Sequence, residues 1–290
     1  MRLVFLGTPD AAVPSLRALV RAGHDVELVI TRPDRRRGRG TQVSSSPVKS
    51  AALELGLQVG HRVSDIEQVD VERGVVVAYG AMIPTSVLEK VPMLNVHFSL
   101  LPRWRGAAPV ERAILAGDEV TGVSVMSLEA TLDTGPVHAM QQTDVDAKTA
   151  SELTSELANL GASLLLKVLS SDTLLSNPLV QSGEPTYAEK LTAETFHLTP
   201  TMSMAQLERT VRLERAFTLI NGRRTKVLAA RTTSDAGVAG TIAQVSGEIA
   251  LCGIGGALIL ERVQPEGSRP MDAQDWWSGV RLDVQHAEWA

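Results

Sequence analysis

The sequence predicts an α/β protein with a doubly wound, mostly parallel, Rossmann-like sheet and a smaller C-terminal β-barrel of the OB-like kind. In the first half, continuous apolar runs, which suit strands covered on both faces, alternate with helical patterns. Later, short apolar segments follow one another with Gly, Ser and Asp between them, which is typical of a small barrel. We therefore expect an α/β domain over residues 1–171, a linker over 172–202 and a β-barrel domain over 203–290.

The N-terminal pattern is that of a strand, a helix and a second strand. The apolar run 3–6 ends at Gly7, a helix is expected over 12–21, and a strand follows over 26–30. This order is the repeating unit of a parallel sheet. Ser46 and the proline after it predict an N-cap and first turn for another helix.

The remaining elements are predicted in the same way, strands from short apolar runs and helices from apolar residues at helical spacing. Further strands of the first domain are predicted at 74–78, 94–97, 123–128 and 137–145. Leucines and alanines at helical spacing predict a long helix over 148–169. The second domain is expected to hold a helix near 203–215 and strands at 226–229, 240–243, 248–251 and 257–260.

Composition limits the possible classes of protein. The formal net charge is −5, which argues against a sequence-independent coat on nucleic acid but leaves room for a local basic patch. A single cysteine, Cys252, excludes a disulfide within the chain and fits a reducing compartment. No apolar run approaches the roughly 18 residues that span a bilayer. The histidines show no metal-ligand spacing, so we expect no membrane, no metal and a cytoplasmic location.

Polar residues interrupt one predicted strand near its carboxyl end. Asn95 and His97 are two apart, so they point to the same side of an extended chain. Ligands of open α/β sheets bind at that end of the strands. An amide can hold a developing oxyanion, and an imidazole can move a proton near neutral pH. Asp133, in a turn-like break between two apolar runs, is a candidate partner for the imidazole, and together they predict acyl transfer without a protein nucleophile.

Several short motifs are spread along nearly the whole chain: Gly7-Thr8-Pro9-Asp10, Arg32-Pro33-Asp34, Val77-Ala78-Tyr79-Gly80, Asn95-Val96-His97, the run from Ser99 to Pro109, Leu132-Asp133-Thr134-Gly135 and Tyr187-Ala188-Glu189-Lys190. Together they resemble the folate-dependent formyltransferases, in particular those that act on methionyl-tRNA. The most specific of these motifs is the Ser-Leu-Leu-Pro run that follows Asn-Val-His.

The resemblance implies a donor, an acceptor and a set of site residues. The donor would be 10-formyltetrahydrofolate, without a metal, and the acceptor the methionyl amine of initiator Met-tRNA, for translation initiation. Asn95, His97 and Asp133 would be catalytic, in a monomer. The folate site would be formed by Ser99, Leu100, Leu101, Pro102, Ala78, Tyr79, Gly80 and Ile83. Contacts to tRNA would come from Arg32, Arg35, Arg36, Arg37, Arg39, Arg103 and Arg105.

The arginine-rich segment 32–40, here called the basic loop, predicts a function from its charge alone. Five arginines lie within eight positions, with Gly38 between the last two of them and Gly40 directly after. Like charges at this density repel one another unless a polyanion is present, and guanidinium groups bind phosphates and stack on bases. The loop therefore predicts contact with RNA, although a solvated charged loop would have the same composition.

Three other functions stay open on the sequence. The same chemistry could act on an amino sugar nucleotide, or water could replace the amine and hydrolyse the formyl folate. A module that binds RNA without catalysis is the third, and the set of Asn95, His97 and Asp133 argues against it. Two departures from the family bear on the choice: Thr131 replaces a glycine before Leu132, and the second domain matches the family thinly.

Overall fold

The computed structural model describes residues 1–36, 43–235, 237–279 and 288–290. By their internal contacts these residues fall into two compact units. The first unit comprises residues 1–110, 119–145 and 153–189, and the second comprises 111–118, 146–152 and 190–290. The predicted domain limits stay a prediction, but residues 172–189 of the expected linker have their contacts in the first unit.

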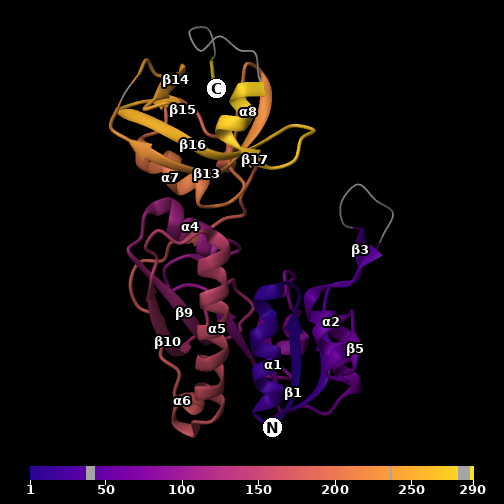
Figure 1. The fold of residues 1–290 in the computed structure, drawn as a ribbon. Coiled ribbons are helices and arrows are strands. Elements are labelled where there is room, and N and C mark those ends of the chain that lie inside the picture. Colours follow the sequence, from indigo (N-terminus) through magenta and orange to yellow (C-terminus); the bar gives the residue numbers. More distant parts are fainter. Residues whose placement is uncertain (37–42, 236, 280–287) are drawn as a thin grey trace. The chain divides into compact units, whose positions relative to one another are not determined.

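A mixed sheet organises the first unit (Figure 1). Its strands are β1 (Arg2–Gly7), β2 (Asp25–Ile30), β5 (Val59–Gly60), β6 (Arg73–Val77), β7 (Met93–His97), β9 (Val120–Ser127) and β10 (Val137–Asp144). They lie in the order β10-β9-β7-β6-β1-β2-β5. The pairs from β7 to β5 are parallel, whereas β9 and β10 are antiparallel to their neighbours. The apolar run of β1 is fully buried, as expected for a central strand.

Helices cover this sheet. They are α1 (Val13–Arg21), α2 (Pro47–Glu54), α3 (Thr85–Leu88), α5 (Ala150–Leu169) and α6 (Asp172–Ser176), with 3-10 turns η1 (Asp10–Ala12) and η2 (Val63–Gln68). Helix α4 (Pro109–Ala116) belongs mostly to the second unit, through its residues 111–116. The predicted cap of α2 is confirmed, since the Ser46 hydroxyl accepts a hydrogen bond from the backbone of Lys49 at 3.0 Å. Close packing fixes Gly161 of α5, where a Cβ would lie 2.7 Å from the Val96 side chain of β7.

Four short strands lie where the periodicity predicted only loops. Strands β3 (Arg35–Arg36) and β4 (Val43–Ser44) pair with each other beside the basic loop, whose residues 37–42 lie outside the described part of the chain. Strands β8 (Arg105–Gly106) and β11 (Tyr187–Ala188) form a parallel pair. Two residues are too few to show a period, so these strands are defined by their partners alone.

The second unit contains an antiparallel sheet. Its strands are β12 (Phe217–Ile220), β13 (Arg223–Thr233), β14 (Ile242–Val245), β15 (Glu248–Gly253), β16 (Gly256–Pro265) and β17 (Met271–Asp272). The order is β12-β13-β16-β15-β14, with β17 beside β16. Helices α7 (Met204–Val211) and α8 (Ala273–Gly279) and the 3-10 turn η3 (Glu194–Phe196) accompany it.

Residues 288–290 join the two edges of this second sheet. On one side, Leu219 and Ala290 exchange two backbone hydrogen bonds of 2.9 and 3.0 Å. On the other, the backbone N–H of Trp289 donates to the carbonyl of Gly240, just before β14. The Trp289 indole is buried and donates to the carbonyl of Cys252 at 2.9 Å. Both edges are thus bonded by one segment, as in a small barrel, and the predicted fold class is confirmed.

Candidate functional site

Asn95 and His97 lie at the carboxyl end of β7 and are both buried. Strand β7 pairs with β6 on one side and β9 on the other, so both side chains rise from the middle of the sheet. Being two residues apart, they lie on one face, as predicted. A buried amide and imidazole are destabilising without hydrogen-bond partners, so we expect each to contact other polar groups of the site.

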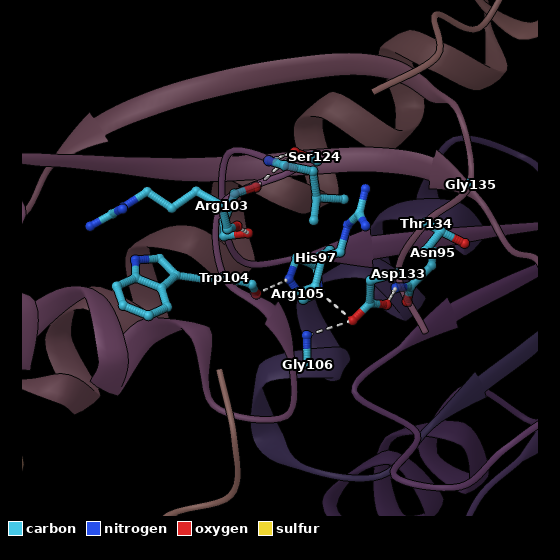
Figure 2. A network of polar contacts seen from close by, with 12 residues as sticks. Asn95, His97, Arg103, Trp104, Arg105, Gly106, Ser124, Asp133, Thr134 and Gly135 are labelled. Atoms are coloured by element: carbon cyan, nitrogen blue, oxygen red, sulfur yellow. Dashed lines mark hydrogen bonds and ion pairs between the residues drawn. The ribbon is translucent and has the colours of Figure 1, made fainter. Parts of the chain in front are cut away.

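The turn between β9 and β10 brings Asp133 to both side chains (Figure 2). Its Oδ1 lies 3.5 Å from the Asn95 Nδ2, and its Oδ2 lies 3.7 Å from the His97 Nδ1. The backbone N–H of Gly106 donates to the same Oδ2 at 2.8 Å. Asp133 itself is buried and has φ +51°, a backbone conformation that residues other than glycine rarely adopt. The structure therefore brings together the three residues that the sequence singled out.

A backbone carbonyl fixes the orientation of the His97 ring. The His97 Nε2 lies 2.9 Å from the carbonyl oxygen of Trp104, which can only accept, so Nε2 carries a hydrogen. The other nitrogen, Nδ1, faces the Asp133 carboxylate. When both nitrogens are protonated, the imidazolium and Asp133 form a buried ion pair. In the described part of the chain neither nitrogen contacts a serine or cysteine. The ring can therefore carry a positive charge or transfer a proton, but it is not positioned to activate a protein nucleophile.

The loop after β7 holds the predicted folate residues Ser99 to Pro102. The hydroxyl of Ser124, on β9, donates to the Ser99 carbonyl at 2.7 Å and accepts from the backbone N–H of Leu101 at 3.1 Å. Ser99, Leu101 and Ser124 are all buried. Because one hydroxyl satisfies both a donor and an acceptor of this loop, its path beside His97 is fixed by the neighbouring strand.

The second group of predicted folate residues follows β6, the neighbour of β7. Ala78 and Gly80 are exposed and have φ of 45° and 76°, which makes a tight turn. The side chains of Tyr79 and Ile83 are buried, and burial raises the pKa of the Tyr79 phenol. The Thr8 hydroxyl, which follows β1, donates to the Tyr79 carbonyl at 3.0 Å. Both predicted folate segments therefore leave adjacent strands at the same edge of the sheet.

The predicted RNA-contacting arginines occupy different settings. Arg37 and Arg39 lie outside the described residues, and of Arg35 and Arg36 only the backbone, in β3, is described. Arg103 is exposed, and its guanidinium lies 4.6 Å from the ring centre of Trp104. The half-buried Arg105 donates from Nε and Nη2 to the Gln181 Oε1, at 3.0 and 2.7 Å. Arg32, also half-buried, follows β2.

Sequence reasoning missed the groups that hold the site together. Ser124 gave a signal, since it is a polar residue inside the apolar strand β9. The contacts from the Trp104 carbonyl and the Gly106 N–H gave none, because backbone groups have no identity in a sequence. Gln181 stood in a polar stretch that we assigned to a linker, without any period or motif.

Thr131, which stands where the family has a glycine, does not adopt the positive φ that a glycine would allow. The non-glycine residue with positive φ in this turn is Asp133, and Thr131 is not among the described residues of that kind. Its hydroxyl contacts that of Thr134. The glycine that close approach requires here is Gly135, where a Cβ would lie 2.0 Å from the Ser127 carbonyl oxygen.

Within the described residues, no three His, Cys, Asp or Glu side chains are grouped to hold a metal ion. The same residues include no helix long and apolar enough to span a membrane.

Two family models match the chain. The formyl transferase model matches residues 1–169, and the model of the formyl transferase C-terminal domain matches residues 190–281. Curated relatives include the methionyl-tRNA formyltransferase of Novosphingobium aromaticivorans, 45% identical over 94% of each chain. That of Rhizorhabdus wittichii is 42% identical over 97% of this chain and 96% of its own.

Solved structures share the fold. HypX from Aquifex aeolicus in complex with tetrahydrofolic acid superposes with a TM-score of 0.64 at 16% identity, over 95% of this chain and 46% of HypX, so the chain spans about half the length of that protein. Methionyl-tRNA formyltransferase from Clostridium thermocellum gives a TM-score of 0.58 at 15% identity, over 90% of this chain and 98% of its own. The family models and the relatives together show that the chain belongs to the formyl transferase family.

Proposed function

We propose that the chain transfers the formyl group of 10-formyltetrahydrofolate to the amine of the methionyl residue on initiator Met-tRNA, for translation initiation. The observation that carries the proposal is the cluster of Asn95, His97 and Asp133, an amide, an imidazole and a carboxylate around one point, in a chain of this family. The relatives named methionyl-tRNA formyltransferase support the choice of acceptor.

In the proposed mechanism the methionyl amine attacks the formyl carbon directly. A new C–N bond forms to the amine, the bond from the formyl carbon to the folate nitrogen breaks, and one amine proton ends on that nitrogen. The Asn95 Nδ2 and the protonated His97 stabilise the tetrahedral oxyanion. Asp133 holds both of these groups and offers its carboxylate to the departing amine proton, directly or through water.

The donor would bind between the loop 99–102 and the turn 78–80. These segments follow adjacent strands, so a pteridine ring bound between them would leave the N10 formyl group of the donor beside His97. Two large apolar side chains are exposed beside site residues in the sequence: Met82, just after the turn 78–80, is 68% exposed, and Leu132, just before Asp133, is 55% exposed. A bound ring would remove such apolar surface from water, which favours binding.

Contact with the acceptor tRNA is proposed for the arginines that the resemblance named. Exposed Arg103 and the basic loop offer charge for phosphates, and such contacts predict an affinity that falls steeply with salt. If neutralising Arg35, Arg36 and Arg37 together left the KM for tRNA and its salt dependence unchanged, this role would be wrong. The substrates imply a cytoplasmic enzyme, and we propose a monomer, which sedimentation at micromolar concentration would test.

One assay tests the proposed function against its alternatives. The chain is incubated with 10-formyltetrahydrofolate and, in separate arms, initiator Met-tRNA, an amino sugar nucleotide, or water only, and formylated product and released tetrahydrofolate are measured. We expect rapid formylation of Met-tRNA and background rates in the other arms. Transfer to the sugar alone, or release of formate with water alone, would contradict the proposal and identify the alternative. The His97→Ala variant is the negative control for contaminating activity.

A further inference from the structure

A crossing segment, residues 179–188, is bonded to both loops that complete the candidate site. At its start, Leu179 and Val137 exchange two backbone hydrogen bonds of 2.7 and 2.8 Å, just after the Asp133 turn. At its end, β11 pairs with β8, so that Ala188 lies beside Gly106, whose N–H holds the Asp133 carboxylate. The segment has no helix and a single two-residue strand, so its role lies in these bonds rather than in its own regular structure.

Gln181 lies near the start of the crossing segment, and both the nitrogen and the oxygen of its side-chain amide bond residues of the site. Its Nε2 donates to the carbonyl oxygens of Asp133 and Gly135, each at 2.8 Å. Its Oε1 accepts both bonds from the guanidinium of Arg105. A primary amide has two hydrogens on nitrogen and two lone pairs on oxygen, and here all four are used. Among the side chains of this length, only glutamine offers two donors and an acceptor at once.

The turn that Gln181 holds needs an outside support. Asp133 has φ +51°, and a non-glycine residue in this region costs about 1 kcal/mol or more unless other contacts hold it. The Gln181 Nε2 bonds the carbonyls on either side of Thr134, so it fixes the backbone that aims the Asp133 carboxylate. Through Arg105 the same amide fixes the residue before Gly106, which binds that carboxylate from the other side.

We propose that Gln181 is a positioning residue for formyl transfer, which sets the Asp133 carboxylate against Asn95 and His97 by holding the Asp133 turn and Arg105 together. The inference rests on the proposed function. Gln181 touches no reacting atom and acts through Asp133. A misplacement of about 1 Å, even from a group outside the reacting set, can cost about 100-fold in rate.

The first test replaces Gln181 by leucine, which has a similar size and no polar atoms. We expect Gln181→Leu to lower kcat about 10- to 100-fold, with the KM for the folate donor within about threefold of the unaltered chain. The matched control is Ser182→Ala, because Ser182 is the exposed neighbour on the same segment. The control should keep the original kcat. A kcat for Gln181→Leu within twofold of the original would overturn the proposal.

A double-mutant cycle separates positioning from general stability. If Gln181 acts through Asp133, Gln181→Leu should change kcat less than about threefold in an Asp133→Asn background. A purely structural effect would instead lower kcat by the same factor in both backgrounds. An equal fold-loss of kcat in both backgrounds would overturn the proposal. Gln181→Glu serves if the leucine variant does not fold, since it keeps the acceptor for Arg105 but places oxygen against two carbonyl oxygens; unaltered kcat in that variant would also overturn it. If the unaltered chain formylated no Met-tRNA, the proposed function would fail instead.

Discussion

The buried polar side chains differ in kind between the two units. Within the described residues, those of the second unit are threonines, Thr210, Thr218 and Thr225. Those of the first unit include a carboxylate, two imidazoles and an amide, namely Asp133, His97, His138 and Asn95. A threonine hydroxyl can satisfy itself on a nearby backbone group, whereas a buried ionisable group carries a large desolvation cost. The buried polar side chains of the second unit are therefore neutral hydroxyls, whereas the first unit also buries groups that can carry a charge.

The backbone shows the same contrast. In the second unit the non-glycine residues with positive φ include Asn221 and Ser246, each followed by a glycine in a turn between strands. Among the described residues of the first unit they are Ala78, Trp104 and Asp133, and all three border the candidate site. Uncommon backbone conformations persist only where surrounding contacts hold them. Changes in the first unit should therefore act on turnover, and changes in the second unit on stability.

The largest effect is expected from His97→Ala. Loss of the imidazole removes an oxyanion-stabilising charge and a proton carrier, so kcat for Met-tRNA should fall about 100- to 1,000-fold. The variant also leaves the Trp104 carbonyl and the buried Asp133 carboxylate without this partner, so some stability is lost and turnover is compared at a temperature where the variant stays folded. Single-turnover formylation with saturating substrates is the measurement. Turnover near that of the unaltered chain would end the proposed catalytic role.

The matching change in the second unit is Trp289→Ala. The indole is buried in the core of the barrel and bonds the Cys252 carbonyl, so we expect the free energy of unfolding to fall by about 3–5 kcal/mol. Urea unfolding followed by circular dichroism measures it. At a temperature where the variant stays folded, kcat should change far less than with His97→Ala. A loss of stability below about 1 kcal/mol would show that residues 288–290 do not close the barrel.

A pair of buried hydroxyls sharpens the comparison. Ser124 on β9 and Thr218 on β12 are both fully buried and bond backbone groups distant in sequence. Ser124→Ala and Thr218→Val should each cost about 1–3 kcal/mol of unfolding free energy. Only Ser124→Ala should also lower kcat, by several-fold, because its hydroxyl holds the loop beside His97. Equal turnover in the two variants would refute the contrast between the units.

The smallest effect concerns acid stability. Burial, with a smaller contribution from the charge of Arg73, lowers the pKa of His138 below its ordinary 6.5. Between the two pKa values the unfolded chain binds more protons than the folded one, so the free energy of unfolding falls as pH drops from 6.5 toward the lowered value. His138→Gln should weaken this decline. Chemical unfolding at several pH values between 5 and 8 measures it, and equal slopes would contradict the assignment.

Part of the site could be predicted because its parts are local. Asn95 and His97 share one buried strand, so strand geometry alone put them on one face, and the break at Asp133 showed a turn. The Ser46 cap and the long helix α5 followed from patterns within a few residues. The apolar periods also gave the fold class. Each of these depends on interactions between near neighbours, which a sequence displays directly.

Other parts were decided only by the tertiary structure. The carbonyl of Trp104 and the N–H of Gly106 became partners of His97 and Asp133 through the path of a loop, and every residue carries such groups. Gln181 meets Asp133 across 48 positions, and Trp289 meets Cys252 across 37. Contacts at such separations depend on how whole elements pack, so their residues carry no local pattern. The sequence determined which groups could do the chemistry, and long-range packing determined how they are held.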